Sequence, residues 1–300
     1  MEATRSFLCA AWQSVGFWKA AAIFFALLNL KTLPFVWHIR VYRYFFKHGY
    51  LITPAVEQPT RPSTEILNPV SIFSRAPIME IDFNMHKSNS TYFSDLDVSR
   101  TALISSVVVK GAALLEKRLE AQGKKGFLGF ILGSVYTNFK REIPAYAKYE
   151  VKSHIASYDQ KWIYIVTYFL KPGMKGVKNG EKVDEEKLKK GLYAVAISKY
   201  VLKKGRYTVP PTEAFEAAGY APFFGAAAAG DASGSSSAVE DNATAAVQRK
   251  EPVGEEGKSD EWERLREEID RGLVVMQPFI DEEGRLLDDF VAKMGRPGFV

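Results

Sequence analysis

The chain has 300 residues, 47% of them apolar and 13% aromatic, which is enough for one large globular domain with appendages or for two small domains. The net charge of +5 is unevenly distributed, because residues 1–230 carry +13 and residues 231–300 carry −8. The basic part suits an anionic partner, such as a membrane surface, a nucleotide-bearing ligand or a nucleic acid. The only cysteine in the sequence is Cys9, which excludes an intrachain disulfide and a cysteine metal cluster.

Residues 1–37 are predicted to be a hydrophobic segment with a membrane-anchoring helix. The uncharged run at 20–30 is shorter than the roughly 20 residues that cross a bilayer. The apolar stretch at 7–37 reaches that length if Lys19 and Lys31 snorkel near its edges. A tilted single-pass span is therefore favoured over an interfacial helix. The alternative is a buried core helix with a basic neighbour, and a cleaved signal peptide fits less well.

Residues 38–70 are predicted to be a basic juxtamembrane stretch followed by a connector. Arginine and lysine interleave with aromatic residues at 38–50, a pattern typical of a segment in an anionic headgroup layer. The four prolines within 53–70 favour an extended connector. Positive charge is denser after the apolar segment than before it, so the remainder of the chain is expected on the cytosolic side of the membrane, with the organelle left open.

The body, residues 71–211, is predicted to be an α+β domain. The segment 75–83, RAPIMEIDF, is interpreted as its first strand, and apolar residues at helical spacing from Ser90 to about Glu120 predict one long, largely buried helix. Segments rich in Tyr, Val, Ile, Phe and Thr then predict antiparallel strands, at 130–143, 148–158, 161–170 and 191–202. The simplest packing wraps this sheet around the helix.

The rest of the chain is predicted to be a linker and a helix. Residues 212–258 are dominated by Ala, Gly, Ser and acidic residues, a composition typical of a disordered low-complexity linker. Residues 259–300 are predicted to be a C-terminal helical segment. Asp260 and Glu263 can form a capping box at the start of a short helix, and an apolar stripe allows this helix to dock on the body.

The stretch DFNMHKSNSTY at 82–92 places an acid, a histidine and an asparagine immediately before the buried helix. A helix start offers unpaired N–H groups and the positive end of a macrodipole, which polarise a carbonyl and stabilise an oxyanion. Asp82, expected at the end of the first strand, can attack that carbonyl or activate a water. His86 can orient the carboxylate, and Asn89 can cap the helix and present its N–H. This pattern favours acyl transfer by hydrolysis, and the alternative is that these residues only cap the helix.

The same stretch resembles the signature D-x-x-G-H-x-N-N-x-x-Y of hot-dog-fold acyl-CoA thioesterases of the 4-hydroxybenzoyl-CoA thioesterase type, which is followed by a helix that closes in an arginine. The matching positions in this chain are Asp82, His86, Asn89, Tyr92 and Arg100. The N-terminal apolar segment and the basic stretch before the domain resemble the eukaryotic thioesterase-superfamily-member-six branch. The chain departs from the signature at Met85, where the family has a glycine that permits a positive φ, and at Ser88, where it has an asparagine.

The resemblance implies a hot-dog fold and a role for each matching residue. Asp82 would be the nucleophile or general base, and N–H groups between Ser88 and Ser90 would polarise the thioester carbonyl. Tyr92 would be a wall or core residue, and Arg100 a structural ion-pair partner. The candidates for binding CoA phosphates are Lys87, Lys140 and Arg141. A neighbouring subunit would complete the acyl pocket, so a homodimer or higher homo-oligomer is expected.

We therefore expect a membrane-anchored acyl-CoA thioesterase that hydrolyses a fatty acyl or aryl thioester, with catalytic residues Asp82, His86 and Asn89. No cofactor, metal or nucleic-acid partner is expected, since the histidines are scattered and no phosphate-binding loop is present. The alternative is a catalytically impaired hot-dog protein that binds acyl-CoA or scaffolds a lipid-metabolism enzyme at the membrane. Met85 in place of glycine bears on this choice.

Overall fold

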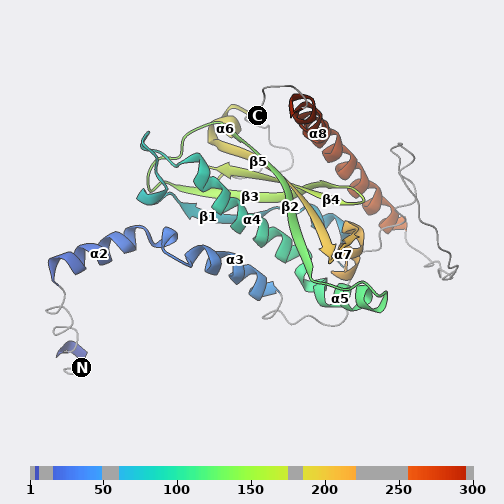
Figure 1. Cartoon of the computed structure of the whole chain (residues 1–300), viewed down its shortest axis with the longest axis horizontal. Coiled ribbons are helices and arrows are strands. Elements are labelled where there is room, and N and C mark those ends of the chain that lie inside the picture. Colours follow the sequence, from blue (N-terminus) through green and yellow to red (C-terminus); the bar gives the residue numbers. More distant parts are fainter. Residues whose placement is uncertain (1–3, 7–15, 49–60, 175–184, 221–255, 295–300) are drawn as a thin grey trace.

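The computed structural model describes residues 4–6, 16–48, 61–174, 185–220 and 256–294. Within them the chain has the predicted α+β hot-dog fold, in which a curved antiparallel sheet wraps around a buried helix (Figure 1).

The sheet has the strand order β1-β3-β4-β5-β2, and short β6 pairs with β5. Its strands are β1 (Val70–Arg75), β2 (Leu128–Phe139), β3 (Lys148–Tyr158), β4 (Trp162–Leu170), β5 (Leu192–Lys204) and β6 (Tyr207–Val209). The register aligns Ile72 with Val151, Val151 with Phe169, and Phe169 with Ala194, so that one apolar row crosses four strands. The four strands predicted after the helix are confirmed, because their alternating side chains separate a buried face from an opposite face.

The prediction for the first strand is wrong. Residues 75–83 contain Pro77, which has no N–H to donate to a ladder, and Ile78–Glu80 form a 3₁₀ turn. The strand is instead Val70–Arg75, which pairs with β3. Asp82 therefore does not end a strand.

The long central helix is two helices. After a 3₁₀ turn at Asn89–Thr91, α4 spans Tyr92–Val107 and α5 spans Ala112–Ala121, with a bend of 48° between them. The bend contains Gly111, where an added Cβ would lie 2.3 Å from the backbone of Ala217. That backbone belongs to α7 (Pro211–Ala217), so the close crossing of α7 accounts for the glycine at the bend.

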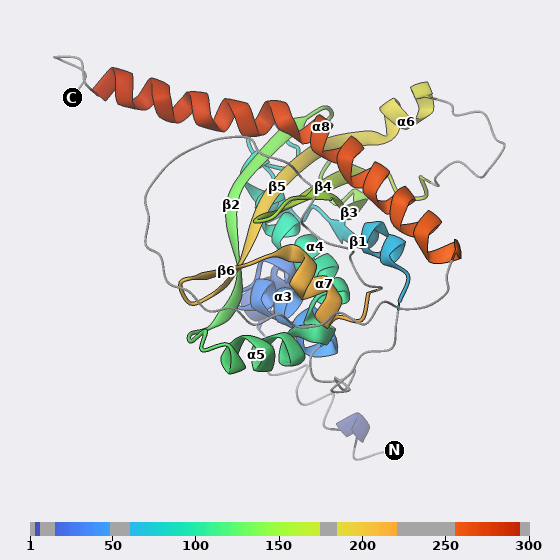
Figure 2. The same cartoon turned by 90° about the vertical axis from the view of Figure 1, so that its right-hand side faces the viewer.

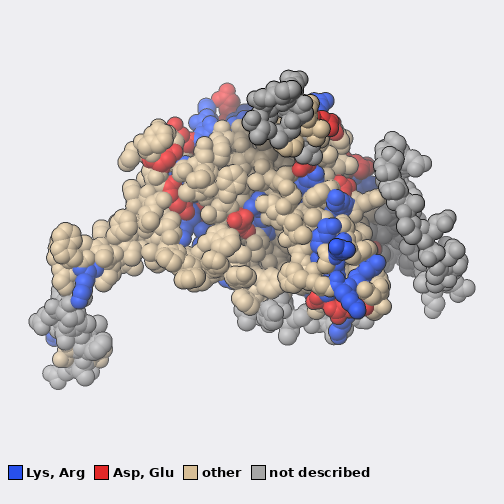
Figure 3. All heavy atoms as spheres, in the orientation of Figure 1, with Lys and Arg blue, Asp and Glu red and all other residues tan. Residues whose placement is uncertain are grey.

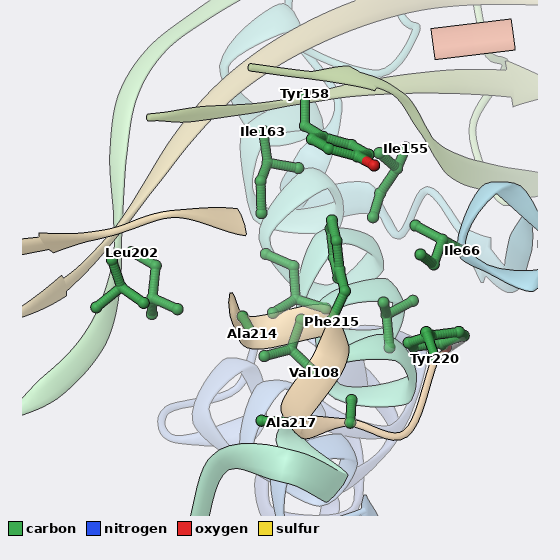
Figure 4. Close-up of a cluster of buried hydrophobic side chains, with 14 of the residues drawn as sticks. Ile66, Val108, Ile155, Tyr158, Ile163, Leu202, Ala214, Phe215, Ala217 and Tyr220 are labelled. Carbon is green, nitrogen blue, oxygen red and sulfur yellow. The ribbon is translucent and has the colours of Figure 1, made fainter. Parts of the chain in front are cut away.

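Helix α4 is buried on most of its circumference, as predicted, because it lies between two layers. One side faces the sheet, and the other contacts α3 (Val36–Phe46). Figure 4 shows the core beyond its C-terminal end, where Val108 lies among Ile155 and Ile163 of the sheet and Phe215 of α7. Residues 212–220, predicted to begin a disordered linker, are thus part of the core, and Phe215 is fully buried. The rest of that predicted linker, 221–255, lies outside the described residues.

The N-terminal segment forms two helices. Helix α2 (Phe17–Leu28) and α3 are separated by a 3₁₀ turn at Leu30–Thr32, so residues 17–46 are not one continuous helix. Among the helices that the structure describes, none is by itself both long and apolar enough to span a bilayer. The helices α4 and α5, with the short turns around them, reach the required length and hydropathy only as a bent pair.

Helix α8 (Glu256–Met294) lies across the face of the sheet opposite to α4 (Figure 2). Its buried Met276 packs with Tyr164 and Val166 of β4, which alternate with inward-facing Ile163 and Ile165. The docking predicted for the C-terminal helix is confirmed. The helix is longer than predicted and begins before Asp260, which is therefore not its N-cap.

Candidate functional site

Asp82 lies in a tight turn rather than at a strand end. Its N–H donates to the carbonyl of His86 at 3.0 Å, and the N–H of Met85 donates to the Asp82 carbonyl at 3.0 Å. The Asp82 Oδ1 accepts the N–H of Asn84 at 2.9 Å. An isolated bridge between Ile81 and Lys87 closes the turn. The carboxylate is therefore held by the local backbone.

Met85 has the backbone conformation for which a glycine is suited. Its φ is +63°, in the left-handed region that costs a side-chain-bearing residue roughly 1–2 kcal/mol. This is the position where the thioesterase signature has glycine, so the turn keeps the same path with a methionine in it. The Met85 side chain points to solvent, with 68% of its surface exposed.

His86 lies between two carboxylates. Its Nδ1 is 3.6 Å from Asp82 Oδ1, and its Nε2 is 3.6 Å from Glu142 Oε1. Both distances exceed a hydrogen bond, although catalytic contacts often tighten only when substrate binds. An isolated bridge between His86 and Pro144 keeps the two segments together. The sequence did not predict that Glu142 belongs to this site, because it lies 60 residues from Asp82 in the chain.

The start of the buried helix leaves two N–H groups available. The Ser88 N–H donates to the Glu80 carbonyl at 2.8 Å, so it is not a free oxyanion donor. Within the described part of the chain, the N–H groups of Asn89 and Ser90 have no acceptor. The predicted cap is wrong, because Ser88 is the N-cap residue and the exposed Asn89 side chain makes no capping hydrogen bond.

A cavity of about 690 Å³ opens beside this helix start. His86, Asn89, Tyr92, Phe139 and Tyr193 contribute to its wall, whereas Asp82 is not one of its lining residues and stands behind His86. Tyr92 is both wall and core, as predicted, with its ring 5.0 Å from that of Phe139 and 2% of its surface exposed. Burial raises the pKa of Tyr92 well above its usual range, which keeps its hydroxyl protonated.

Cationic side chains from three segments surround the cavity. Lys140, Arg141 and Lys171 line it and are exposed. Lys87 also lines it, but its side chain is fully buried and its Nζ lies 2.6 Å from Glu80 Oε2. The prediction that Lys87 binds a CoA phosphate is therefore disfavoured. Lys171 was not singled out from the sequence, where it begins a lysine-rich insertion.

Lys87 belongs to a buried charge cluster, defined here as Lys31, Arg40, Glu80, Lys87 and Asp95. The Lys31 Nζ lies 2.7 Å from Glu80 Oε2 and 2.9 Å from Asp95 Oδ2. Arg40 reaches the other Asp95 oxygen at 2.9 Å, and the Tyr149 hydroxyl donates to Asp95 at 2.5 Å.

Burial by itself would raise the pKa of Asp95. The charges of Lys31, Lys87 and Arg40, together with the hydrogen bond from Tyr149, outweigh burial and hold that pKa well below its usual range.

The buried charge cluster ties the N-terminal helices to the turn that holds Asp82 and His86. Lys31 comes from the break between α2 and α3, while Glu80 and Lys87 flank the turn that holds Asp82 and His86. The sequence suggested that Lys31 snorkels beside a membrane span, but its side chain points into the body with 13% of its surface exposed.

Arg100 is a structural residue, as predicted. It is 1% exposed, and it donates to Asp97 at 2.5 Å and to Ser198 Oγ at 2.8 Å. Among the residues that the structure describes, no group of three or more His, Cys, Asp or Glu side chains is arranged to hold a metal ion.

Comparisons with known proteins find similarity to thioesterases. The family model of the thioesterase-like superfamily matches residues 76–201. Thioesterase lcsJ of Purpureocillium lilacinum is 34% identical over 235 residues, which cover 68% of this chain and 72% of that protein. Probable thioesterase atnL of Emericella nidulans is 35% identical over 235 residues, covering 70% and 74%. A solved structure of a probable thioesterase from Bartonella henselae aligns with 48% of this chain and 98% of its own, at 14% identity and a TM-score of 0.35.

Proposed function

Because the chain belongs to the thioesterase-like superfamily, we propose that it hydrolyses a fatty acyl-CoA or aryl-CoA to the free acid and CoA. The observation that carries this proposal is the pair of free N–H groups of Asn89 and Ser90, which open a buried helix next to a cationic cavity. Fixed donors of this kind stabilise the oxyanion of an acyl-transfer intermediate.

The thioester carbonyl oxygen accepts hydrogen bonds from these two N–H groups. Acting as a base, Asp82 takes a proton from a water whose oxygen attacks the carbonyl carbon; the C–S bond then breaks and CoA leaves as a thiolate that is reprotonated. Acting as a nucleophile, Asp82 attacks the carbonyl carbon, the C–S bond breaks and CoA leaves as a thiolate that is reprotonated; a water then hydrolyses the resulting mixed anhydride and regenerates the Asp82 carboxylate. The base route suits the position of Asp82 outside the cavity wall, since a general base can act through a water. His86 then orients the Asp82 carboxylate.

The three exposed cations of the cavity suit the phosphates of CoA. Lys140, Arg141 and Lys171 come from the end of β2 and the end of β4, on two sides of the opening. Charge-assisted hydrogen bonds to phosphate are shorter and stronger than neutral ones. Glu142, on the same rim, limits where a phosphate can sit.

A second copy of the chain would complete the pocket along β2. This edge strand has 12 residues and pairs only with β5 among the described strands, and it exposes Ile131 and Tyr136 by about half. Open apolar edges of this length favour association. Phe139, at the end of β2, lines the cavity, so a partner at this edge adjoins the substrate. Sedimentation of the full chain as a monomer at micromolar concentration would overturn this part of the proposal.

The N-terminal helices would attach the enzyme to a membrane, with the body on the cytosolic side. Phe17, Trp18, Phe24 and Leu27 of α2 are more than 60% exposed, an arrangement expected of a helix in contact with lipid. In the view of Figure 3, the surface around α2 is mostly neither basic nor acidic. Carbonate extraction combined with protease protection tests both the attachment and the side.

The second candidate function is binding of acyl-CoA without turnover. It is favoured by Met85, which puts strain into the catalytic turn, and by the position of Asp82 outside the cavity wall. Substitution of Met85 by glycine separates the two, because an impaired enzyme gains activity when the strain is removed.

The decisive experiment compares Asp82→Asn with Asp159→Asn. Both carboxylates lie in tight turns and accept a backbone N–H two residues on, at 2.9 Å and 2.7 Å, but Asp159 is in the β3–β4 hairpin away from the cavity. We expect Asp82→Asn to lower thiol release from a panel of acyl-CoAs by about 10²–10⁴-fold and Asp159→Asn to leave it within a few fold. Equal activity of both variants and wild type would refute a catalytic Asp82.

A further inference from the structure

A second cavity, of about 440 Å³, lies between the N-terminal helices and β1. We call it the hinge groove. It shares no lining residue with the cavity at His86. Its cationic lining residues are Lys31, Arg40, Arg43 and Arg75, and it has no acidic lining residue.

In the part of the chain that the structure describes, two of these four cations have no carboxylate partner. Lys31 and Arg40 are paired with Glu80 and Asp95. Within the described residues, Arg43 donates only to the Tyr44 hydroxyl, at 2.6 Å, and Arg75 donates only to the Tyr146 carbonyl, at 3.1 Å. Each guanidinium carries five N–H donors, so most of their donors are available to an anion.

The remaining wall of the hinge groove is mostly apolar. Leu27, Leu28 and Leu30 line it from the end of α2 and the following turn, and Val36 lines it from the start of α3. Leu27 and Leu30 are more than half exposed. The groove thus has two guanidiniums with available donors among leucine side chains, next to the exposed apolar residues Phe24 and Leu27 of α2.

We propose that the hinge groove binds the phosphate of an anionic phospholipid, with Arg43 and Arg75 on the phosphate and the leucine wall against its glycerol and first acyl carbons. A free phosphate needs only the cations, whereas the leucine wall fits a ligand that is also apolar. The guanidinium fork matches phosphate geometry in a way that an ammonium group does not. The proposal rests on the membrane attachment proposed above and names the lipid class that the attachment selects.

The test is flotation of the full chain, synthesised in the presence of vesicles of phosphatidylcholine alone or of an equimolar mixture with phosphatidylserine. We expect wild type to bind the mixed vesicles more strongly. Neutralising both arginines, in Arg43→Gln/Arg75→Gln, should reduce binding to mixed vesicles by about fivefold per charge, or about 30-fold in all. Binding to phosphatidylcholine alone should not change, because the apolar face of α2 is intact.

Two control variants separate a phosphate site from general attraction. Arg264→Gln removes an exposed arginine on α8, away from the N-terminal helices (Figure 1), and should bind as wild type does. Arg43→Lys/Arg75→Lys keeps the charge but loses the planar pair of guanidinium N–H donors. It should bind mixed vesicles more weakly than wild type. If the lysine variant equals wild type, or if Arg264→Gln loses as much as the glutamine pair, the proposal is overturned.

The remaining outcomes distinguish this proposal from the ones it rests on. Equal binding of wild type to both kinds of vesicle overturns the selection of an anionic phospholipid and leaves attachment standing, whereas no binding to either overturns both. If inorganic phosphate competes with vesicle binding more strongly than chloride does at equal ionic strength, the groove is assigned to free phosphate. The phospholipid proposal is then overturned. Thioester hydrolysis by the arginine variants in detergent should equal that of wild type, because neither arginine lines the catalytic cavity.

Discussion

Replacing Lys31 by methionine tests whether the N-terminal helices are part of the folded body. The Lys31 ammonium lies within 3.0 Å of Glu80, Asp95 and the Tyr149 hydroxyl, and only 13% of the side chain is exposed. Methionine keeps most of the length of the side chain and removes the charge. The variant therefore removes the interaction of a buried cation and leaves its packing largely in place.

The expected loss follows from the composition of the buried charge cluster. Breaking a buried ion pair by removing one partner costs about 3–5 kcal/mol, because the remaining charge is uncompensated. Arg40 and Lys87 still face Asp95 and Glu80 in the variant, so the lower value, about 3 kcal/mol, applies. For a chain of this size each kcal/mol shifts the melting temperature by about 2–4 °C. The expected drop is about 6–12 °C.

Thermal unfolding in mild detergent, followed by tryptophan fluorescence, measures this drop. The matched control is Lys19→Met, which removes an exposed lysine from α2 and should change the melting temperature by less than about 2 °C. A shift for Lys31→Met no larger than that of the control would refute the reasoning. It would mean that the segment around Lys31 does not rest on the body in solution.

Three further outcomes follow from the structure. Gly111→Ala should destabilise the chain by about 1–3 kcal/mol, since its Cβ would lie 2.3 Å from the backbone of α7. The control Gly284→Ala on α8, where nothing lies within 4 Å of the added Cβ, should not destabilise the chain. Chemical denaturation measures the free energy of unfolding of both variants. Met85→Gly should raise the free energy of unfolding by up to about 1 kcal/mol, since it relieves a φ of +63° in the turn that holds Asp82 and His86. An unchanged or lower free energy of unfolding would contradict this. The pKa of Asp95 is lowered in the folded state, so its contribution to stability is present above its ordinary pKa of about 3.9 and is lost as pH falls below that value. Unfolding free energies measured between pH 5 and 3 should show this as a slope of up to about 1.4 kcal/mol per pH unit, and a flat profile would contradict it.

Local patterns in the sequence predicted the sheet well. The segment 148–158 was identified with the bounds that β3 has, because its side chains alternate and turn residues follow it. In the turn that follows, the Asp159 carboxylate accepts the N–H groups of Lys161 and Trp162 at 2.7 Å. In both cases the deciding interactions are between residues close in sequence.

Predictions failed where contacts between distant residues decide the outcome. Lys87 seemed free to bind a phosphate, because Glu80 and Asp95 meet it only after the chain has folded. Lys31 was expected to snorkel toward a headgroup layer, because its partners lie 49 and 64 residues further along the chain. Both errors concern a charge whose partners come from other elements.

Composition was misleading at the start of the low-complexity region. The alanines of α7 resemble those of the segment that follows, yet Ala217 is 1% exposed and lies where Gly111 has no Cβ. Small side chains allow the two backbones to approach closely. The same composition that indicates a linker is therefore required for this contact, and only the folded structure distinguishes the two.

Helix α8 limits the ways in which copies of this chain can assemble. A curved sheet offers neighbours one broad outer face and two narrow edges, and stacking on a broad face can continue from copy to copy without end. Here α8 occupies part of the broad face, and it lies so close to β3 that a Cβ on Gly272 would fall 1.9 Å from the Ala156 carbonyl oxygen. Contacts through the long edge strand β2 remain. If two copies pair there about a two-fold axis, each copy covers the β2 edge of the other. The assembly is then a closed dimer to which no third copy can be added through this edge.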